Sequence, residues 1–271
     1  MPELPEVEIT RRGITPHILG NTVERVVVRN AALRWPVPRR LARELKQCSI
    51  DSVKRRAKYL LLGSRAGTVI LHLGMSGSLR VLPVAEAAQK HDHVDLVFSN
   101  KICLRLRDPR RFGAVLWTHG APEKHKLLRN LGPEPLSRAL DGEYLYQKSR
   151  GRRVALRNFL LDSRVVAGIG NIYANEAAFL AGVLPQRAAG RISHLRYQQL
   201  TSALKQVLRA AIRRGGTTLR DFQRSDGRPG YFGQELNVYG RQGEPCPRCQ
   251  NPVVRTTLAA RSLFYCPTCQ T

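Results

Sequence analysis

Two pairs of cysteines near the C-terminus constrain the fold more than any other feature of this chain. Cys246 and Cys249 form one C-x-x-C pair, and Cys266 and Cys269 form a second after a gap of 16 residues. This spacing is typical of a four-thiolate zinc site built on paired β-turns. We therefore predict one structural Zn(2+) ion per monomer and a β-hairpin between the two turns, with Arg261 near its tip. Such a hairpin is too small to fold without its metal.

A redox pair or disulfide bonds would be the alternative to zinc. The motif is duplicated and nothing in the sequence indicates secretion, so metal is favoured. The two remaining thiols, Cys48 and Cys103, lie in segments that read as strands. We expect both to be buried small hydrophobic groups.

The net charge identifies the kind of partner. The chain has 45 Lys and Arg residues against 20 Asp and Glu residues, which gives a formal charge of +25. This excess of positive charge is larger than solubility requires, and the basic residues occur in clusters throughout the chain. Both facts imply that the partner is a polyanion. There is no signal peptide and no apolar run of membrane length, so we expect a cytoplasmic protein.

The N-terminus carries a candidate nucleophile. Removal of Met1 would leave Pro2 with a free secondary amine, and an α-amino group titrates near pH 8, well below lysine, so a useful fraction is unprotonated at neutral pH. Glu3 beside it could move protons. Taken alone, proline followed by acidic residues is also an ordinary way to start a helix.

Periodicity predicts a β domain followed by an α domain. Apolar residues at helical spacing indicate a short helix from Pro5 that ends near Pro16 or Gly20. Short segments in which apolar and polar residues alternate then predict strands. A series of such strands suggests a sandwich or barrel. A long amphipathic helix follows around residues 200–212 and ends at Gly215 and Gly216. The predicted strands are 22–29, 49–55, 59–63, 68–73, 78–82, 93–98, 102–106 and 114–117.

Three polar turns could contact DNA. Residues 167–176 read as a glycine-lined turn that opens a helix, where free N–H groups bind phosphate and where Asn171 is expected at a cap position. The turns 72–77 and 108–113 each hold up one large apolar side chain, Met75 and Phe112. By default both would be core residues, but apolar wedges beside arginine also unstack DNA, and Arg110 could fill the space of an extruded base.

These motifs together resemble bacterial formamidopyrimidine-DNA glycosylases, which repair 8-oxoguanine. The resemblance spans essentially the whole chain. It implies an α+β fold with a leading helix and a two-layer β-sandwich, a helix–two-turns–helix domain and a four-cysteine zinc finger, with duplex DNA bound in the cleft between the halves. The implied domains are 1–132, 133–234 and 235–271. The matching segments are 2–8, 55–60, 72–77, 108–113, 168–174, 227–232 and the zinc hairpin.

The resemblance also assigns roles to individual residues. Pro2 would attack C1′ of the damaged nucleotide, Glu3 would act as the acid that helps to open the sugar, and Lys58 would hold a phosphate. The implied reaction excises oxidised purines, both 8-oxoguanine and formamidopyrimidines, and cleaves the strand by β,δ-elimination. Arg261 and Asn171 would clamp phosphates, and the further DNA-binding positions are His72, His91, Arg152 and the void-filling triad of Met75, Arg110 and Phe112.

One position departs from the pattern of this family. Many relatives carry a lysine where this chain has Arg157, and arginine keeps the charge but alters the donor geometry. The segment from Thr217 to Tyr231 resembles the family's lesion-capping loop. We expect a monomer that works on damaged double-stranded DNA without a nucleotide cofactor or a membrane, associated with the nucleoid through DNA binding.

Two other functions remain open from the sequence. The sister enzyme endonuclease VIII, which removes oxidised pyrimidines, would share Pro2, Glu3, Lys58 and the zinc finger, although the triad of Met75, Arg110 and Phe112 favours the purine enzyme. A non-catalytic zinc-ribbon DNA-binding protein would explain the charge and the cysteines, but it leaves Pro2 and Glu3 unexplained.

Overall fold

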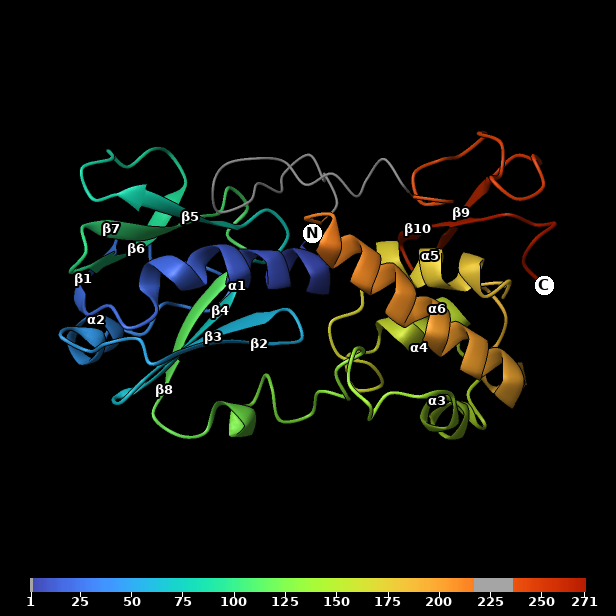
Figure 1. Ribbon diagram of the computed structural model, residues 1–271, viewed down its shortest axis with the longest axis horizontal. Helices are drawn as coiled ribbons and strands as arrows, with labels where there is room; N and C mark the ends of the chain where they lie inside the picture. The colour runs from blue at the N-terminus through green and yellow to red at the C-terminus, as the bar shows by residue number, and fades with distance from the viewer. Residues whose placement is uncertain (1, 217–235) are drawn as a thin grey trace. The chain divides into compact units, whose positions relative to one another are not determined.

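The chain folds into two compact units. The structure, a computed structural model, describes residues 2–216 and 236–271. The first unit comprises Met1–Arg129 with Arg214–Tyr231, and the second comprises Asn130–Arg213 with Phe232–Thr271 (Figure 1). The predicted domain boundaries after residues 132 and 234 stay predictions. Within the described ranges, no helix has the length and apolar character needed to cross a membrane.

The leading helix α1 spans Leu4–Ile18, as its periodicity predicts. Pro5 lies in the first turn, where its missing N–H costs nothing, and Glu3 and Glu6 form a capping box. The helix continues through Pro16 and ends at Ile18, before Gly20 takes a φ of 76°. It packs against β2 (Ser52–Arg56) and β3 (Tyr59–Ser64) of one sheet and against β5 (Ser78–Pro83) and β7 (Ile102–Arg107) of the other, so it lies along one side of the sandwich.

The β domain is a sandwich of two antiparallel four-stranded sheets. One sheet has the order β1-β6-β7-β5 and the other the order β2-β3-β4-β8. Leu60 and Leu62 of β3 share one buried core with Leu96 and Phe98 of β6 and with Leu104 of β7. All eight predicted strands are present. They were predictable because the alternation of apolar residues along a strand indicates which of its faces is buried. Their bounds are β1 Val23–Val28, β2 Ser52–Arg56, β3 Tyr59–Ser64, β4 Gly67–His72, β5 Ser78–Pro83, β6 Asp92–Phe98, β7 Ile102–Arg107 and β8 Ala114–Thr118.

One helix in this unit was not predicted, and it corrects the expectation for Cys48. The short helix α2 spans Leu41–Leu45, and its five residues are too few to establish a helical period. Cys48 follows α2 outside any strand, and its thiol donates to the Glu44 carbonyl oxygen at 3.4 Å. Cys103 lies in β7 as expected, and both thiols are buried, so they act as small core groups.

The second unit contains the helix–two-turns–helix arrangement. α4 (Leu156–Leu161) is followed by two turns and then by α5 (Asn171–Leu180). α6 (His194–Arg213) extends the predicted amphipathic helix in both directions and packs against α5 and α3 (Gly142–Ser149). Short 3₁₀ turns occur at Pro122–Lys124 in the first unit and at Ala189–Arg191 in the second.

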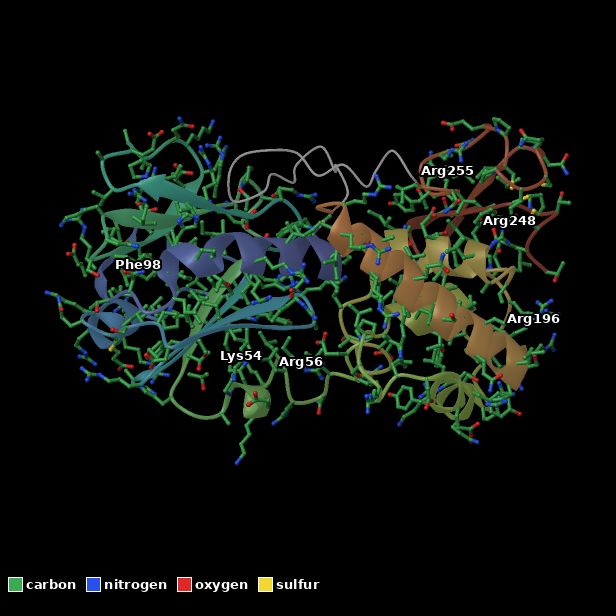
Figure 2. The ribbon with its side chains drawn as sticks, in the orientation of Figure 1. Lys54, Arg56, Phe98, Arg196, Arg248 and Arg255 are labelled. Carbon is green, nitrogen blue, oxygen red and sulfur yellow. The ribbon has the colours of Figure 1, made fainter. Side chains whose placement is uncertain are left out.

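The zinc module docks on α5 of the same unit. Its hairpin consists of β9 (Val254–Leu258) and β10 (Arg261–Tyr265), and Arg261 starts the second strand as predicted. Phe179 of α5 shares a small core with Val253 and Phe264. The Arg248 guanidinium lies 4.6 Å from the Phe179 ring centroid and donates to the Phe179 and Leu180 carbonyl oxygens at 3.2 and 2.9 Å, which satisfies the C-terminal end of α5 (Figure 2).

Candidate active site and nucleic-acid interface

The chain terminus is held by the start of α1. Pro2 is buried, and Glu3 at the N-cap is only 3% exposed. The Glu3 backbone N–H donates to Oε2 of Glu6 at 2.8 Å, and this bond is half of the capping box. The backbone around the candidate nucleophile is therefore fixed by the helix that follows it. Met1 lies outside the described residues.

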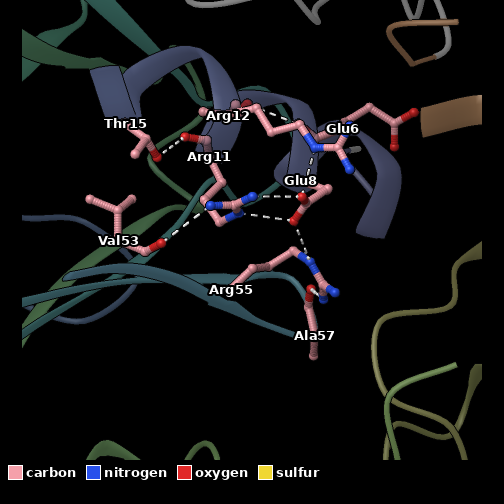
Figure 3. A network of polar contacts seen from close by, with 9 residues as sticks. Glu6, Glu8, Arg11, Arg12, Thr15, Val53, Arg55 and Ala57 are labelled. Carbon is pink, nitrogen blue, oxygen red and sulfur yellow. Dashed lines mark hydrogen bonds and ion pairs between the residues drawn. The ribbon is translucent and has the colours of Figure 1, made fainter. Parts of the chain in front are cut away.

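A carboxylate on α1 fixes the helix against β2. Glu8 accepts from Arg11 and Arg12 on its own helix at 2.9 Å each and from Arg55 of β2 at 3.3 Å, while Arg11 donates to the Val53 carbonyl oxygen at 3.4 Å (Figure 3). Burial raises the pKa of Glu8, but the hydrogen bonds and charges of the three arginines outweigh it and lower the pKa to about 2. Glu8 is thus an ionised structural anchor at neutral pH.

Lys58 lies in the turn that follows the strand bonded to Glu8. It follows Arg55 by three positions, between β2 and β3. In the same turn, Nη1 of Arg55 donates to the Ala57 carbonyl oxygen at 2.8 Å. The contact between Glu8 and Arg55 therefore leads directly into the turn that carries Lys58. That Lys58 works beside Pro2 stays a prediction.

One ring nitrogen of His72 is held by the backbone, and the other is a hydrogen-bond donor. Its Nδ1 accepts from the Gly74 backbone N–H at 3.0 Å, so the neutral ring carries its proton on Nε2. The Tyr59 ring lies 4.8 Å away, and burial, followed by the charges of Lys58 and Arg34, lowers the pKa of His72 to about 4. His72 is therefore a neutral hydrogen-bond donor at pH 7, close to Lys58.

The turns 73–77 and 108–113 are locked together. Asp108 is fully buried, its Oδ1 accepts from the Ser76 hydroxyl at 2.9 Å and its Oδ2 accepts from the Gly113 N–H at 2.7 Å. Gly74 has a φ of 63°, and a Cβ there would lie 2.4 Å from the Phe112 carbonyl carbon. Only glycine allows the two turns to approach this closely.

These locked turns expose the predicted triad. Met75 is 37% exposed and Phe112 is 42% exposed, so the default expectation of core residues is wrong for both. The Arg110 guanidinium lies 4.9 Å from the Phe112 ring centroid. His91 joins the same region, because its carbonyl oxygen accepts from the Asp108 N–H at 3.0 Å. Three predicted DNA-binding residues therefore lie on this pair of turns, and a fourth, His91, is hydrogen-bonded to one of them.

Asn171 is placed one residue away from the expected cap. Gly170 is the N-cap of α5 and Asn171 is the first helical residue. Its side-chain amide therefore does not cap its own helix, and it donates instead to the Ser262 carbonyl oxygen of β10 at 2.8 Å. An amide has a second N–H, so this bond fixes the side chain and leaves capacity for an acceptor such as a phosphate oxygen.

The remaining predicted cations of the second unit are on its surface. Arg152 is exposed in the loop that follows α3, and Arg261 is exposed at the start of β10. Exposed guanidinium groups can reach phosphate oxygens without paying a desolvation cost in the free protein.

The four cysteines form one cluster. Their Sγ atoms all lie within 4.8 Å of one another, with 3.4 Å between Cys249 and Cys266 and 3.9 Å between Cys246 and Cys269. A tetrahedral Zn–S distance of about 2.3 Å requires sulfur separations of about 3.8 Å, so the donor set fits zinc. All four positions are thiols, which is the composition of a closed structural site.

Several residues that build the site were not identified from sequence. Asp108 and Ser76 lock the triad turns, and Glu6 closes the capping box. On α5, Asn175 accepts from the Phe264 N–H at 2.9 Å, and Glu176 accepts from the backbone of residues 237–239 at 2.9 Å. A carboxylate or amide inside an apolar segment is the only sequence signal for such roles. The predicted lesion-capping loop, Thr217 to Tyr231, lies outside the described residues.

Comparisons with known proteins agree with this architecture. The formamidopyrimidine-DNA glycosylase N-terminal domain matches residues 1–115, the H2TH domain of the same glycosylases matches residues 131–223, and a zinc finger found in FPG and IleRS matches residues 243–271. These three domains define the class of zinc-finger DNA glycosylases.

Full-length relatives identify the family within that class. Formamidopyrimidine-DNA glycosylase of Alteromonas mediterranea is 55% identical over 271 residues, and that of Stenotrophomonas maltophilia is 56% identical over 270, each covering 100% of both chains. The crystal structure of the MutM (Fpg) protein of Thermus thermophilus covers 99% of this chain and 98% of its own, with a TM-score of 0.90 and 38% identity. Lactococcus lactis Fpg in complex with abasic-site DNA covers 99% of both chains, with a TM-score of 0.91 and 30% identity. This chain belongs to the formamidopyrimidine-DNA glycosylase family.

Proposed function

We propose that this protein is a base-excision repair enzyme that removes oxidised purines, 8-oxoguanine and formamidopyrimidines, from duplex DNA and then cleaves the strand. Family membership supports this function above that of an oxidised-pyrimidine glycosylase or a non-catalytic zinc ribbon. The observation that carries the proposal is the buried position of Pro2 directly before the capped start of α1.

The chemistry begins with the amine of Pro2. Its lone pair attacks C1′ while the bond from C1′ to the purine breaks, and the proton that the Pro2 nitrogen then loses goes to the departing base. Glu3 acts as the acid that protonates the sugar ring oxygen and opens the ring, which yields an iminium between Pro2 and C1′.

The iminium then drives strand cleavage. Its positive charge acidifies C2′, so loss of a C2′ proton expels the 3′ phosphate in a β-elimination. A second proton loss expels the 5′ phosphate in the δ-elimination. Lys58 holds a phosphate beside the reacting sugar through its positive charge. Excision and strand cleavage therefore use the same terminal amine.

Access to the base requires distortion of the duplex. Met75 and Phe112 are exposed apolar side chains on locked turns, so they can wedge into the base stack at no cost in core packing. Arg110 would fill the space that the extruded base leaves. His72 and His91 would contact the DNA from the same unit.

The second unit would hold the phosphate backbone. Asn171, Arg152 and Arg261 contribute the phosphate contacts, and a zinc ion on the four cysteines would hold the hairpin that carries Arg261. The zinc is structural and takes no part in the reaction. We further propose a monomer in the cytoplasm that associates with the nucleoid through its DNA contacts.

Borohydride trapping tests the proposal. Borohydride reduces an iminium to a stable amine, so incubation with duplex DNA that carries 8-oxoguanine opposite cytosine should yield a covalent complex. Intact mass should show loss of Met1, because an amide bond on the Pro2 nitrogen removes its nucleophilicity. Absence of a complex with a correctly processed protein, or substantial cleavage by protein that retains Met1, would overturn the assignment of Pro2.

A further inference from the structure

A buried arginine on α4 reaches the tip of the zinc hairpin. Arg157 is 1% exposed, and its Nη2 donates to the Leu258 carbonyl oxygen at 2.6 Å and to the Arg261 carbonyl oxygen at 3.3 Å. Leu258 and Arg261 are the cross-strand partners that close the hairpin. One guanidinium therefore holds both ends of the turn from which Arg261 emerges.

The turn between these two residues is strained. Ala259 and Ala260 form a two-residue connection with φ angles of 47° and 57°. Such connections favour Asn and Gly because both central residues need a positive φ. The left-handed conformation is unfavourable for alanine because it brings Cβ too close to the following carbonyl oxygen, so this hairpin tip requires support from outside itself.

Arginine suits this buried position better than lysine. A single nitrogen, Nη2, makes both carbonyl bonds, and a guanidinium is more weakly hydrated than a lysine ammonium, so it is easier to bury. Burial, together with the nearby charge of Arg261, lowers the pKa of Arg157. Among the described residues, no acceptor bonds Nε of Arg157. The two bonds to the hairpin carbonyl oxygens are therefore the contribution of this side chain to the turn.

We propose that Arg157 is a positioning residue for Arg261: it fixes the strained turn of Ala259 and Ala260, so that the exposed guanidinium of Arg261 starts from one backbone position. Where Arg261 binds a phosphate, as the proposed function has it, Arg157 raises affinity without touching DNA. Burial favours arginine over lysine in this chain, because a lysine keeps the charge but is more strongly hydrated.

A test without DNA examines the turn alone. Hydrogen exchange is measured on peptides that cover residues 254–265 in Arg157→Lys and Arg157→Met, with zinc content assayed in parallel. Arg255→Lys is the matched control, because Arg255 is exposed on β9 of the same hairpin. We expect exchange at the turn to rise at least about tenfold in both Arg157 variants and not in the control. Unchanged exchange in Arg157→Lys would overturn the proposal whether or not the protein repairs DNA.

A test with DNA examines the link to Arg261. Affinity for a duplex that carries a tetrahydrofuran abasic analogue is measured for Arg157→Lys, Arg261→Ala and the double variant. We expect Arg157→Lys to weaken binding about tenfold, the equivalent of about 1.4 kcal/mol, and to add nothing once Arg261 is alanine. Additive losses would show that Arg157 acts independently of Arg261 and would overturn the proposal.

Rescue separates positioning from general folding. Ala259→Asn with Ala260→Gly supplies the residues that this type of turn prefers. Added to Arg157→Lys, the pair should restore protection at the turn and most of the DNA affinity. If the rescued turn is protected but affinity stays low, Arg157 does not act through the turn and the proposal fails.

Discussion

The Ser76 hydroxyl donates to Oδ1 of Asp108 at 2.9 Å and joins the two turns that carry Met75 and Arg110. The Asp108 carboxylate is fully buried, and its other oxygen accepts from the Gly113 N–H. The exposed triad thus depends on a buried hydrogen bond between two residues that lie 32 positions apart in the sequence.

Ser76→Ala should therefore loosen both turns. Removing a hydrogen bond to a buried charge costs about 1.5–3 kcal/mol, and we expect this loss in the free energy of unfolding measured with urea. Single-turnover excision of 8-oxoguanine should also slow, because Met75 and Phe112 lose their fixed orientation. Ser64→Ala is the control, since its hydroxyl donates to the Gly67 carbonyl oxygen at a distant turn. Wild-type stability in Ser76→Ala would contradict the locking role.

The anchor at Glu8 predicts a pH dependence of stability. Its pKa is about 2 in the folded protein against 4.5 for the free group. A lowered pKa means that the stabilisation is complete above pH 4.5 and is lost as the pH falls towards 2. Glu8→Gln should thus be clearly less stable than wild type at pH 7, and the difference should shrink below pH 4.5.

Urea unfolding at a series of pH values from 7 to 3 measures this difference. Glu24→Gln serves as the control, because Glu24 forms an exposed pair with Lys101 at 3.8 Å, and such a pair contributes about 0–1 kcal/mol. A difference between wild type and Glu8→Gln that stays constant across this range would show that the ionised carboxylate is not the anchor.

The sequence predicted the sandwich well and the polar contacts poorly, for physical reasons. Alternation marks buried strand faces at each residue, so β3 and β6 were predictable to within one or two residues. Side-chain partners depend on the tertiary fold. Nothing in the local sequence indicates that Asn171 bonds Ser262, 91 positions away, or that Arg157 bonds Leu258.

The exposed triad is an instructive case. Met75 and Phe112 are apolar, and burial is the usual fate of such residues. Both side chains are exposed, because the turns around them contain glycine and charged residues, which the core would exclude. The composition of the flanking turn was thus more informative about burial than the hydrophobicity of the residue itself. That the triad fills a void in DNA stays a prediction.

Salt dependence should distinguish the two kinds of phosphate contact. Binding falls with salt through counterion release, with a log–log slope of about −0.9 for each phosphate neutralised. Arg261→Ala should weaken binding and reduce the slope by about one. Asn171→Ala should weaken binding with the slope unchanged, because an amide carries no charge. A wild-type slope near zero would refute the charge-based account of binding.

Zinc removal should unfold the hairpin and spare the sandwich. The small core around Phe179 includes Cys246 and Cys266, so loss of the metal removes most of what holds the module together. Chelation or Cys249→Ser should expose residues 254–265 to proteolysis and abolish duplex binding. Cys48→Ala, a buried thiol of the other unit, should retain zinc and binding. Incision at the normal rate by metal-free protein would rule out a structural role for zinc.

The last prediction separates the nucleophile from the acid. Pro2→Gly keeps a terminal amine but makes it primary and flexible, so excision should be strongly impaired while DNA binding persists. Glu3→Gln retains an oxygen that can accept in the capping box with Glu6, but it cannot deliver a proton. We expect base excision by Glu3→Gln to fall by roughly two to four orders of magnitude, the range for a positioned acid–base group.

A pre-made abasic site isolates the two roles. There the base has already left, and the sugar exists partly as an aldehyde that the Pro2 amine can attack without an acid. Glu3→Gln should therefore be inactive on 8-oxoguanine and still be trapped by borohydride on abasic DNA, whereas Pro2→Gly should be impaired on both. Comparable losses of Glu3→Gln on the two substrates would make Glu3 a structural support for the terminus through its capping box with Glu6. Normal excision by a variant that combines Pro2→Ala with Lys58→Ala would show that the nucleophile lies elsewhere.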